Sequence, residues 1–187
     1  MDESRDYSFA RYLCPNKSVD DRALNRHVWH SLENALPLVE PGSPLRIFEV
    51  GSGIGTMLER MMDWNLLRYA EYLGLDSIPD NINFAMQRIN NWAIAQGFQM
   101  SLDAANNFTL KRDDKQLTVR FLTADLFEYI ANWGSQERWD LLVAHAFLDL
   151  MDIPRTLPLL FKLLKPNGIF YFSINYDGIT LLEPILD

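Results

Sequence analysis

Apolar residues along the chain gather in short runs that alternate with stripes at helical spacing. Runs with the length of strands lie at 45–50, 71–76, 117–123, 139–147 and 169–175. Helical spacing predicts helices that begin near Met57, at about 80–96, at 126–133 and after Asp152, with one more at about 19–37. This alternation predicts an α/β fold with a doubly wound, mainly parallel sheet and helices on both faces.

Residues 98–123 depart from the simple alternation of strand and helix. Apolar residues at 108 and 110 alternate with polar neighbours, Asp113 and Asp114 follow, and alternation resumes from Leu117. The two aspartates are typical of a turn. We therefore expect an antiparallel hairpin at the sheet edge, whose second arm is the third core strand and ends at Asp125.

The segment before the first strand is expected to be an accessory unit. Ser18 and Asp21 match a capping box. The stripe that predicts the helix at 19–37 consists of Leu24, Val28, Leu32, Ala35 and Leu36. Residues 5–15 carry several aromatics and are expected to form a lid. We divide the chain into residues 1–44, a lid and helical extension, and residues 45–187, the main domain.

Three alternating glycines follow the first predicted strand. Gly51, Gly53 and Gly55 stand between that strand and the helix start, where glycine allows a tight turn and the close approach of a ligand. The dinucleotide fingerprint G-x-G-x-x-G would need glycine at position 56, which is Thr56. The turn therefore predicts a binding site for a small molecule. The alternative is a glycine-rich turn that binds no ligand.

The spacing Glu49-x-Gly51-x-Gly53-x-Gly55 resembles motif I of the class I S-adenosylmethionine-dependent methyltransferases. In that family the turn holds the methionine part of the cofactor. The segment 163–170 is similar to the family's Leu-Lys-Pro-Gly-Gly turn, with Asn167 in place of one glycine. The resemblance covers about residues 45–175. It implies a Rossmann-like domain that binds S-adenosylmethionine.

The resemblance implies roles for residues at the strand ends. Asp76 would accept hydrogen bonds from the ribose hydroxyls, and Asp125 would accept one from the adenine amino group. Both aspartates precede predicted helices, so helix capping is an alternative for each. The full set implied as cofactor-binding is Glu49, Gly51, Ser52, Gly53, Gly55, Asp76, Ser77, Ala124, Asp125, Leu126 and His145.

Methyl transfer depends mainly on how the acceptor is positioned, and a general base helps only if the acceptor must lose a proton. His145 at the end of the fourth core strand is the candidate base or acceptor-orienting residue. Asp149 and Asp152 are the second candidates. Alternatively, this histidine bonds only a backbone carbonyl. The chain lacks the D/N-Pro-Pro-Tyr motif of amino-directed methyltransferases, which favours oxygen, carbon or other acceptors.

Composition and net charge disfavour several classes of binding partner. A formal net charge of −8 over 187 residues argues against nucleic acid, which requires a basic surface. No apolar run has the length of a membrane span, and the acidic first residues do not resemble a signal peptide. The single cysteine, Cys14, cannot form an internal disulfide. We expect a cytoplasmic protein with a small-molecule acceptor and no metal site.

Members of the resembled family continue after the fifth strand with a helix and two more strands. This chain ends at Asp187, so we expect a fragment of a longer protein or a partner that covers the last strand. Left uncovered, the apolar strand 169–175 predicts self-association. Two other functions remain as alternatives: a catalytically silent S-adenosylmethionine-binding or assembly module, and an NAD-dependent dehydrogenase, which Thr56 disfavours.

Overall fold

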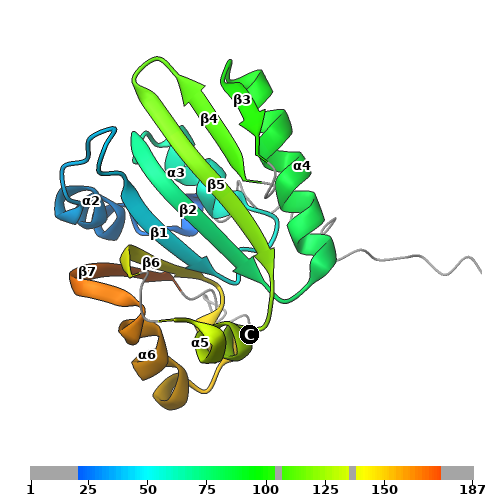
Figure 1. Ribbon diagram of the computed structural model, residues 1–187. Coiled ribbons are helices and arrows are strands. Elements are labelled where there is room, and N and C mark those ends of the chain that lie inside the picture. Colours follow the sequence, from blue (N-terminus) through cyan, green and yellow to red (C-terminus); the bar gives the residue numbers. More distant parts are fainter. Residues whose placement is uncertain (1–20, 104–106, 135–137, 174–187) are drawn as a thin grey trace, which may run out of the picture.

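A single β-sheet organises the described part of the chain, which comprises residues 21–103, 107–134 and 138–173 of the computed structural model (Figure 1). Its strands are β1 (Leu45–Val50), β2 (Tyr69–Asp76), β3 (Gln99–Leu102), β4 (Phe108–Arg112), β5 (Lys115–Thr123), β6 (Trp139–His145) and β7 (Leu164–Ser173). The helices are α2 (Arg26–Ala35), α3 (Thr56–Asp63), α4 (Pro79–Ala95), α5 (Leu126–Asn132), the 3-10 turn η1 (Leu148–Leu150) and α6 (Ile153–Lys162). None of these helices is long and apolar enough to cross a membrane.

The order of the strands confirms the predicted doubly wound fold. The sheet runs β3-β4-β5-β2-β1-β6-β7, in which β5, β2, β1, β6 and β7 are parallel to one another. The chain first moves outward from β1 to β2 and β5, and then returns to place β6 on the other side of β1. The order therefore reverses between β1 and β6. In open α/β sheets, ligands bind beyond the carboxyl ends of the strands at such a switch point.

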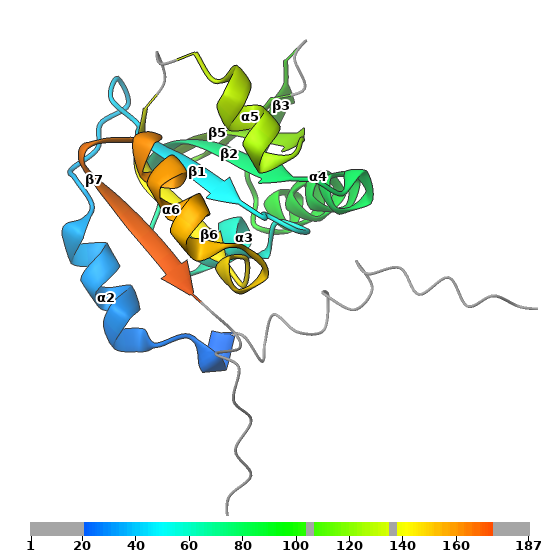
Figure 2. The ribbon, with the colours of Figure 1, turned by 90° about the horizontal axis from the view of Figure 1, so that it is seen from below.

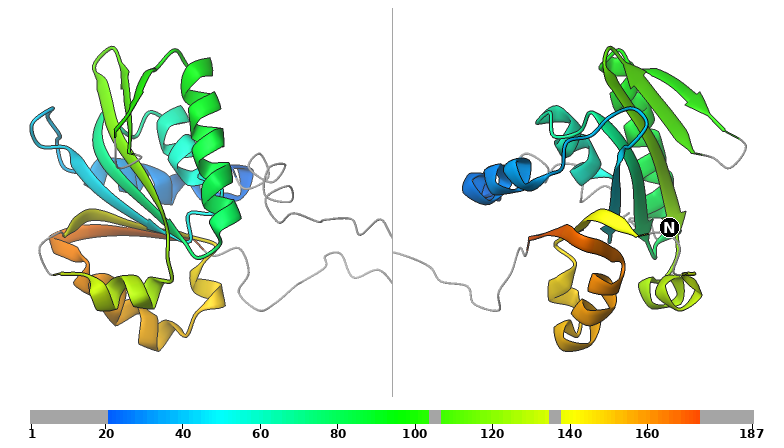
Figure 3. Two further views of the ribbon diagram at one scale, coloured as in Figure 1. Left: turned by 45° about the vertical axis from the view of Figure 1, so that its right-hand side comes forward. Right: turned by 60° about the vertical axis from the view of Figure 1, so that its left-hand side comes forward.

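Two hydrophobic clusters cover the two faces of the sheet. Because side chains along a strand alternate between faces, Ile47 belongs to one cluster and Phe48 to the other. Helices α2, α3 and α4 cover the first face, and α5 and α6 cover the second (Figure 3). The strands β1 and β6 are buried on both faces, which explains their nearly continuous apolar sequences.

The predicted hairpin is confirmed as β4 and β5. Asp113 lies in the turn with a φ of 52°, a left-handed conformation that aspartate tolerates. The structure adds β3, which pairs antiparallel with β4 and forms the outer edge. We missed β3 because all four of its residues are exposed, so it has no buried alternation to detect.

The continuous helix predicted for residues 19–37 is wrong. The backbone leaves the helical conformation at Asn25, whose side chain accepts hydrogen bonds from the backbone of His27 (2.9 Å) and Val28 (3.3 Å) and begins α2. As a result Trp29, not Val28, is buried, and its ring meets Tyr171 of β7 edge-on at 5.6 Å between centroids. Figure 2 shows α2 lying alongside β7. The capping residue Ser18, the lid at 5–15 and Cys14 lie outside the described residues.

The last strand, β7, is the other edge of the sheet. Asn167 has a φ of 62°, as its left-handed tolerance predicts, and it lies where the pairing with β6 shifts register. Phe170 is 54% exposed on this strand. Self-association through this edge stays a prediction, and its last two residues, 174 and 175, lie outside the described ranges.

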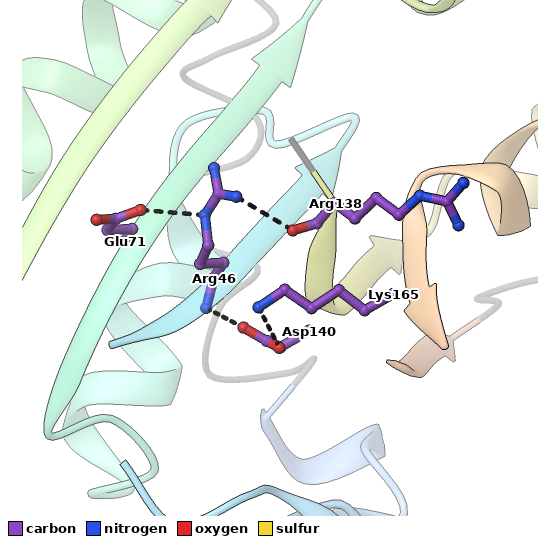
Figure 4. Close-up of polar contacts among 5 residues, drawn as sticks. All are labelled: Arg46, Glu71, Arg138, Asp140 and Lys165. Atoms are coloured by element: carbon purple, nitrogen blue, oxygen red, sulfur yellow. Dashed lines mark hydrogen bonds and ion pairs between the residues drawn. The ribbon is translucent and has the colours of Figure 1, made fainter. Parts of the chain in front are cut away.

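Charged side chains join the amino-terminal halves of four parallel strands (Figure 4). One carboxylate oxygen of Asp140 accepts from the backbone N–H of Arg46 at 2.9 Å, and the other lies 2.7 Å from Lys165 Nζ. Arg46 also donates to Glu71 (3.1 Å) and to the carbonyl of Arg138 (3.3 Å). These contacts connect β1, β2, β6 and β7 at the end of the sheet opposite to the strand carboxyl ends.

We expect Asp140→Ala to lower the free energy of unfolding by about 1–3 kcal/mol, because it leaves the Arg46 N–H without its acceptor. Lys165→Ala is the matched control, since it breaks only the partly exposed ion pair and should cost less than about 1 kcal/mol. Urea unfolding followed by circular dichroism measures both. A larger loss for Lys165→Ala than for Asp140→Ala would contradict this role of the partly buried bond to the Arg46 backbone.

Candidate functional site

A cavity of about 350 Å³ lies at the switch point, beyond the carboxyl ends of β1, β2, β5 and β6. Each strand end contributes the residues that directly follow it. The lining consists of 49–54 and Thr56, then 75–78 and Asn81, then 124–127, and finally 145–147, Leu150 and Met151. The fold therefore brings together four segments that are distant in the sequence.

Of the residues predicted to bind a cofactor, all but one line this cavity. They are Glu49, Gly51, Ser52, Gly53, Asp76, Ser77, Ala124, Asp125, Leu126 and His145. The exception is Gly55, which is buried below the turn, where an added Cβ would lie 3.3–3.4 Å from Phe121, Ala85 and Ile89. Its glycine is explained by a φ of 77° and by this contact with α4 and β5.

The glycine turn has no room for a side chain at Gly51. Gly51 has a φ of 66°, and a Cβ at this position would lie 2.4 Å from a ring carbon of Phe147. Gly53 has a φ of 52°. Any other residue at Gly51 would be strained and would collide with the aromatic ring that follows β6. At these two glycines the turn therefore presents backbone without a side chain to the cavity, which allows a ligand to approach closely.

Asp76, at the end of β2, connects three parts of the site. Its Oδ2 accepts from the backbone N–H of Gly53 at 2.9 Å. Its Oδ1 accepts from the N–H of Ile78 at 2.9 Å and from Asn81 Nδ2 at 3.1 Å. This carboxylate therefore fixes the glycine turn to the end of β2 and also holds the first turn of α4.

The two roles expected for Asp125 do not exclude one another. Its Oδ1 accepts from the backbone of Phe127 (2.8 Å) and Glu128 (3.1 Å), so the residue is the N-cap of α5. The same side chain is exposed and lines the cavity. The cap uses only one carboxylate oxygen, and therefore the capping alternative and the ligand role are both compatible with the geometry.

Glu49 provides a buried carboxyl group at the base of the cavity. It is 1% exposed and accepts a hydrogen bond from the hydroxyl of Tyr72 on the neighbouring strand. Burial raises the pKa of Glu49 to about 8, against the Tyr72 bond and the positive charge of Arg60, which both lower it, while Asp76 adds to the rise. Glu49 is therefore mostly protonated at neutral pH.

The candidate base and its alternatives differ in position. His145 lines the cavity, is half-buried, and its Nδ1 lies 2.5 Å from Ser173 Oγ. Asp149 does not line the cavity, because the 3-10 turn η1 brings Leu150 there instead. Asp152 caps α6 through the N–H of Arg155 at 3.3 Å and is also outside the lining. Of the three candidates, only His145 lines the cavity, and its role as a base stays a prediction.

Sequence reasoning missed several residues of the site. The hydroxyl of Tyr72 donates a hydrogen bond to Glu49, and the amide of Asn81 donates one to Asp76. The ring of Phe147 packs against Gly51. A signal existed for Tyr72, since alternation places it on the same face of the sheet as Glu49 once β1 and β2 are paired. Asn81 carried a weaker signal, as a polar residue in the first turn of a helix that directly follows a strand end.

Acidic groups dominate the charge of the cavity. Among the residues that the structure describes, its lining includes the carboxyl groups of Glu49, Asp76 and Asp125 and no lysine or arginine. Among the described residues, no group of three or more histidine, cysteine or acidic side chains could hold a metal ion. The cavity therefore suits a ligand with hydroxyl, amino or cationic groups better than an anion.

No protein-family model matches the chain. A search of curated proteins likewise gives no match. Among solved structures, the chain is similar to the plantazolicin methyltransferase BpumL in complex with SAH, at 22% identity over 70% of this chain and 38% of that chain, with a TM-score of 0.43. It is also similar to the precorrin-6y C5,15-methyltransferase from Geobacter metallireducens GS-15, at 14% identity over 79% and 62% of the two chains and a TM-score of 0.48.

A third similar structure is PKMT2 from Rickettsia typhi in complex with AdoHcy, at 20% identity over 72% of this chain and 21% of that chain, with a TM-score of 0.43. The chain therefore spans less than two thirds of the length of each of these proteins. The identities are all below 25% and the TM-scores below 0.5. The function of the chain must accordingly be inferred from its own site.

The raised pKa of Glu49 predicts a pH dependence of stability. Because the pKa of Glu49 is about 8 in the folded state and its ordinary value is 4.5, the folded state binds a proton that the unfolded state has lost in this interval. The stability that this proton contributes is fully present below pH 4.5 and is lost as the pH rises through about 8. Between these values, the unfolding free energy should fall by about 1.4 kcal/mol per pH unit more in the wild type than in Glu49→Gln.

Urea unfolding at several pH values between the two pKa values measures this difference. Glu71→Gln is the control, since that carboxyl group is about half-exposed and its loss should leave the slope unchanged. Equal slopes for the wild type and Glu49→Gln would show that Glu49 is not protonated in the folded state.

Proposed function

We propose that the chain binds S-adenosylmethionine in this cavity and transfers its methyl group to a small-molecule acceptor. The observation that carries the proposal is the convergence of the glycine turn, Asp76 and Asp125 on one cavity at the switch point of the sheet. The motif resemblance and the position of the cavity are independent observations, and both support the same ligand.

The residues around the cavity fit an adenosyl cofactor. A volume of about 350 Å³ is at the lower end of the range for small-molecule pockets. Each carboxylate oxygen can accept two hydrogen bonds. The known contacts of Asp76 leave Oδ2 one further position for a ribose hydroxyl, and the cap at Asp125 leaves Oδ2 for an adenine amino group. The backbone of Gly51 and Gly53 would lie against the methionine part.

Glu49 supports the placement of the cofactor's ammonium group near the base of the cavity. A protonated Glu49 costs little to bury in the free protein, whereas a nearby positive charge favours its ionised form. When bound, S-adenosylmethionine supplies a methyl carbon on a positively charged sulfur with a neutral leaving group. The residues of the chain then have to orient the acceptor and, where needed, take its proton.

The β6 side of the cavity is where we place the acceptor. Its lining there consists of His145, Phe147, Leu150 and Met151, which are apolar except for the imidazole. Within residues 21–103, 107–134 and 138–173, the lining offers no lysine or arginine to a phosphate, and the whole chain carries a net charge of −8. These features support a small acceptor without a strong negative charge and disfavour a nucleic acid.

Titration calorimetry with S-adenosylhomocysteine tests the proposal and the role of Asp125 together. Asp125→Ser should weaken binding about tenfold or more, because it removes a charged acceptor worth about 1.5–3 kcal/mol. Its melting temperature should stay near the wild-type value, because serine is also a good N-cap. Asp152→Ser makes the same exchange at the N-cap of α6, outside the cavity, and should leave the affinity unchanged.

The outcomes separate the alternatives. Absence of binding heat at high micromolar ligand, in protein shown to be folded, would refute the proposal. Tighter binding of NADH than of S-adenosylhomocysteine would support a dehydrogenase instead. Binding without transfer of a labelled methyl group to any fraction of a cell extract would support a silent binding module.

Binding should also depend on pH through Glu49. Below its pKa of about 8, the ammonium group of the ligand must displace the proton of Glu49, so affinity should rise with pH by up to about tenfold per unit between roughly pH 6 and 8. In Glu49→Gln this rise should disappear, and any titration of the ligand itself would remain in both proteins. Calorimetry at three pH values is the measurement, and a wild-type affinity that does not change with pH would contradict the placement.

A further inference from the structure

Ser173 contacts the candidate base and the residue that follows it, through two different groups. It is the last residue of β7 and pairs in register with His145, the last residue of β6. Its side-chain oxygen lies 2.5 Å from His145 Nδ1. Its carbonyl accepts from the backbone N–H of Ala146 at 2.8 Å. One residue of the edge strand thus holds both the imidazole and the backbone that follows it.

The backbone held in this way is strained. Ala146 has a φ of 50°, and the left-handed conformation costs a residue other than glycine about 1–2 kcal/mol. Such strain persists when the surrounding contacts fix it, and it gathers at functional sites. Here the bend ends β6 directly after His145 and brings Phe147 onto Gly51. The bond to Ser173 is therefore part of what aims this segment at the cavity.

The direction of the side-chain bond is coupled to which imidazole nitrogen can accept a proton. In a neutral histidine one nitrogen donates and the other accepts, and the bond made by one nitrogen sets the state of the other. A serine hydroxyl can take either role. If Nδ1–H donates to Ser173 Oγ, then Nε2 carries the lone pair and can accept a proton. If the hydroxyl donates to Nδ1, then Nε2 carries the hydrogen and cannot.

We propose that Ser173 is a positioning residue that accepts from Nδ1–H of His145 and so makes Nε2 the proton acceptor of the site. This inference rests on the proposed function. As the reaction proceeds, the proton of the acceptor's O–H passes to Nε2 and the electron pair it leaves forms the bond to the methyl carbon. The electron pair of the broken carbon–sulfur bond stays on sulfur, which becomes a neutral thioether.

A bond that only joined β6 to β7 would not select a tautomer, and the experiment uses this difference. The chain has three histidines, and the other two, His27 and His30, lie on α2. In protein labelled with ¹⁵N-histidine, nuclear magnetic resonance distinguishes a nitrogen that carries hydrogen from one that carries a lone pair. The signals missing from His145→Gln identify those of His145, and the two remaining histidines are internal references.

We expect the wild type to show the Nδ1–H form of His145, both free and saturated with S-adenosylhomocysteine. Ser173→Ala should shift the tautomer ratio toward Nε2–H by about tenfold, as the loss of one hydrogen bond predicts. Ser173→Thr keeps the hydroxyl on a residue that suits a strand, and it should restore the wild-type ratio. Ser31→Ala is the matched control, since that hydroxyl contacts the backbone of His27 at 3.0 Å, away from the cavity.

An Nε2–H form in the wild type, or an unchanged ratio in Ser173→Ala, would overturn the inference. The first of these outcomes applies even if Ser173→Ala does not fold, because it concerns the wild type alone. Calorimetry on the same samples keeps the two proposals apart. Failure to bind S-adenosylhomocysteine refutes the proposed function, whereas normal binding with the wrong tautomer refutes only the role of Ser173.

Discussion

The bond between the Asp76 carboxylate and the N–H of Gly53 is the contact on which the site depends. A turn built around left-handed glycines has little conformational preference of its own, because glycine loses more freedom on folding than any other residue. Two bonds to β2 fix it: this one at 2.9 Å, and the bond from the N–H of Ser52 to the carbonyl of Leu75, also at 2.9 Å. The cavity has a defined shape because these bonds hold the ends of β1 and β2 together.

The same carboxylate influences the charge of the cavity. Asp76 raises the pKa of the buried Glu49, in addition to the larger effect of burial. Two carboxyl groups near one cavity are hard to ionise together, so one of them keeps its proton. The Tyr72 hydroxyl and Arg60 act in the opposite direction and leave the pKa at about 8. The free site is thus close to neutral at its base and can become more negative when a positive group arrives.

The sequence predicted those features that follow from the residue pattern within each segment and from the general geometry of parallel sheets. Glycine spacing and the acidic residues at two strand ends placed Gly51, Asp76 and Asp125 in one cavity, because parallel strands bring their carboxyl ends to one edge. The prediction failed where a local contact overrode a periodic pattern. The apolar stripe continues through Asn25, but a capping side chain competes with the helix there and interrupts it. The 3-10 turn that contains Asp149 likewise has no periodic signal, and it places Leu150 instead of Asp149 in the lining of the cavity.

The contacts between side chains of neighbouring strands could not be predicted from single segments. They join residues that come together only through the order and register of the strands. Tyr72 reaches Glu49 only because β2 lies beside β1, and Ser173 reaches His145 only because β7 lies beside β6 in a fixed register. A shift of one residue in either strand would turn the hydroxyl to the opposite face of the sheet. The hydrophobic pattern of each strand therefore determines the hydrogen-bond partners in the site indirectly. It fixes the register, and the register decides which hydroxyl meets the carboxyl group and which meets the imidazole.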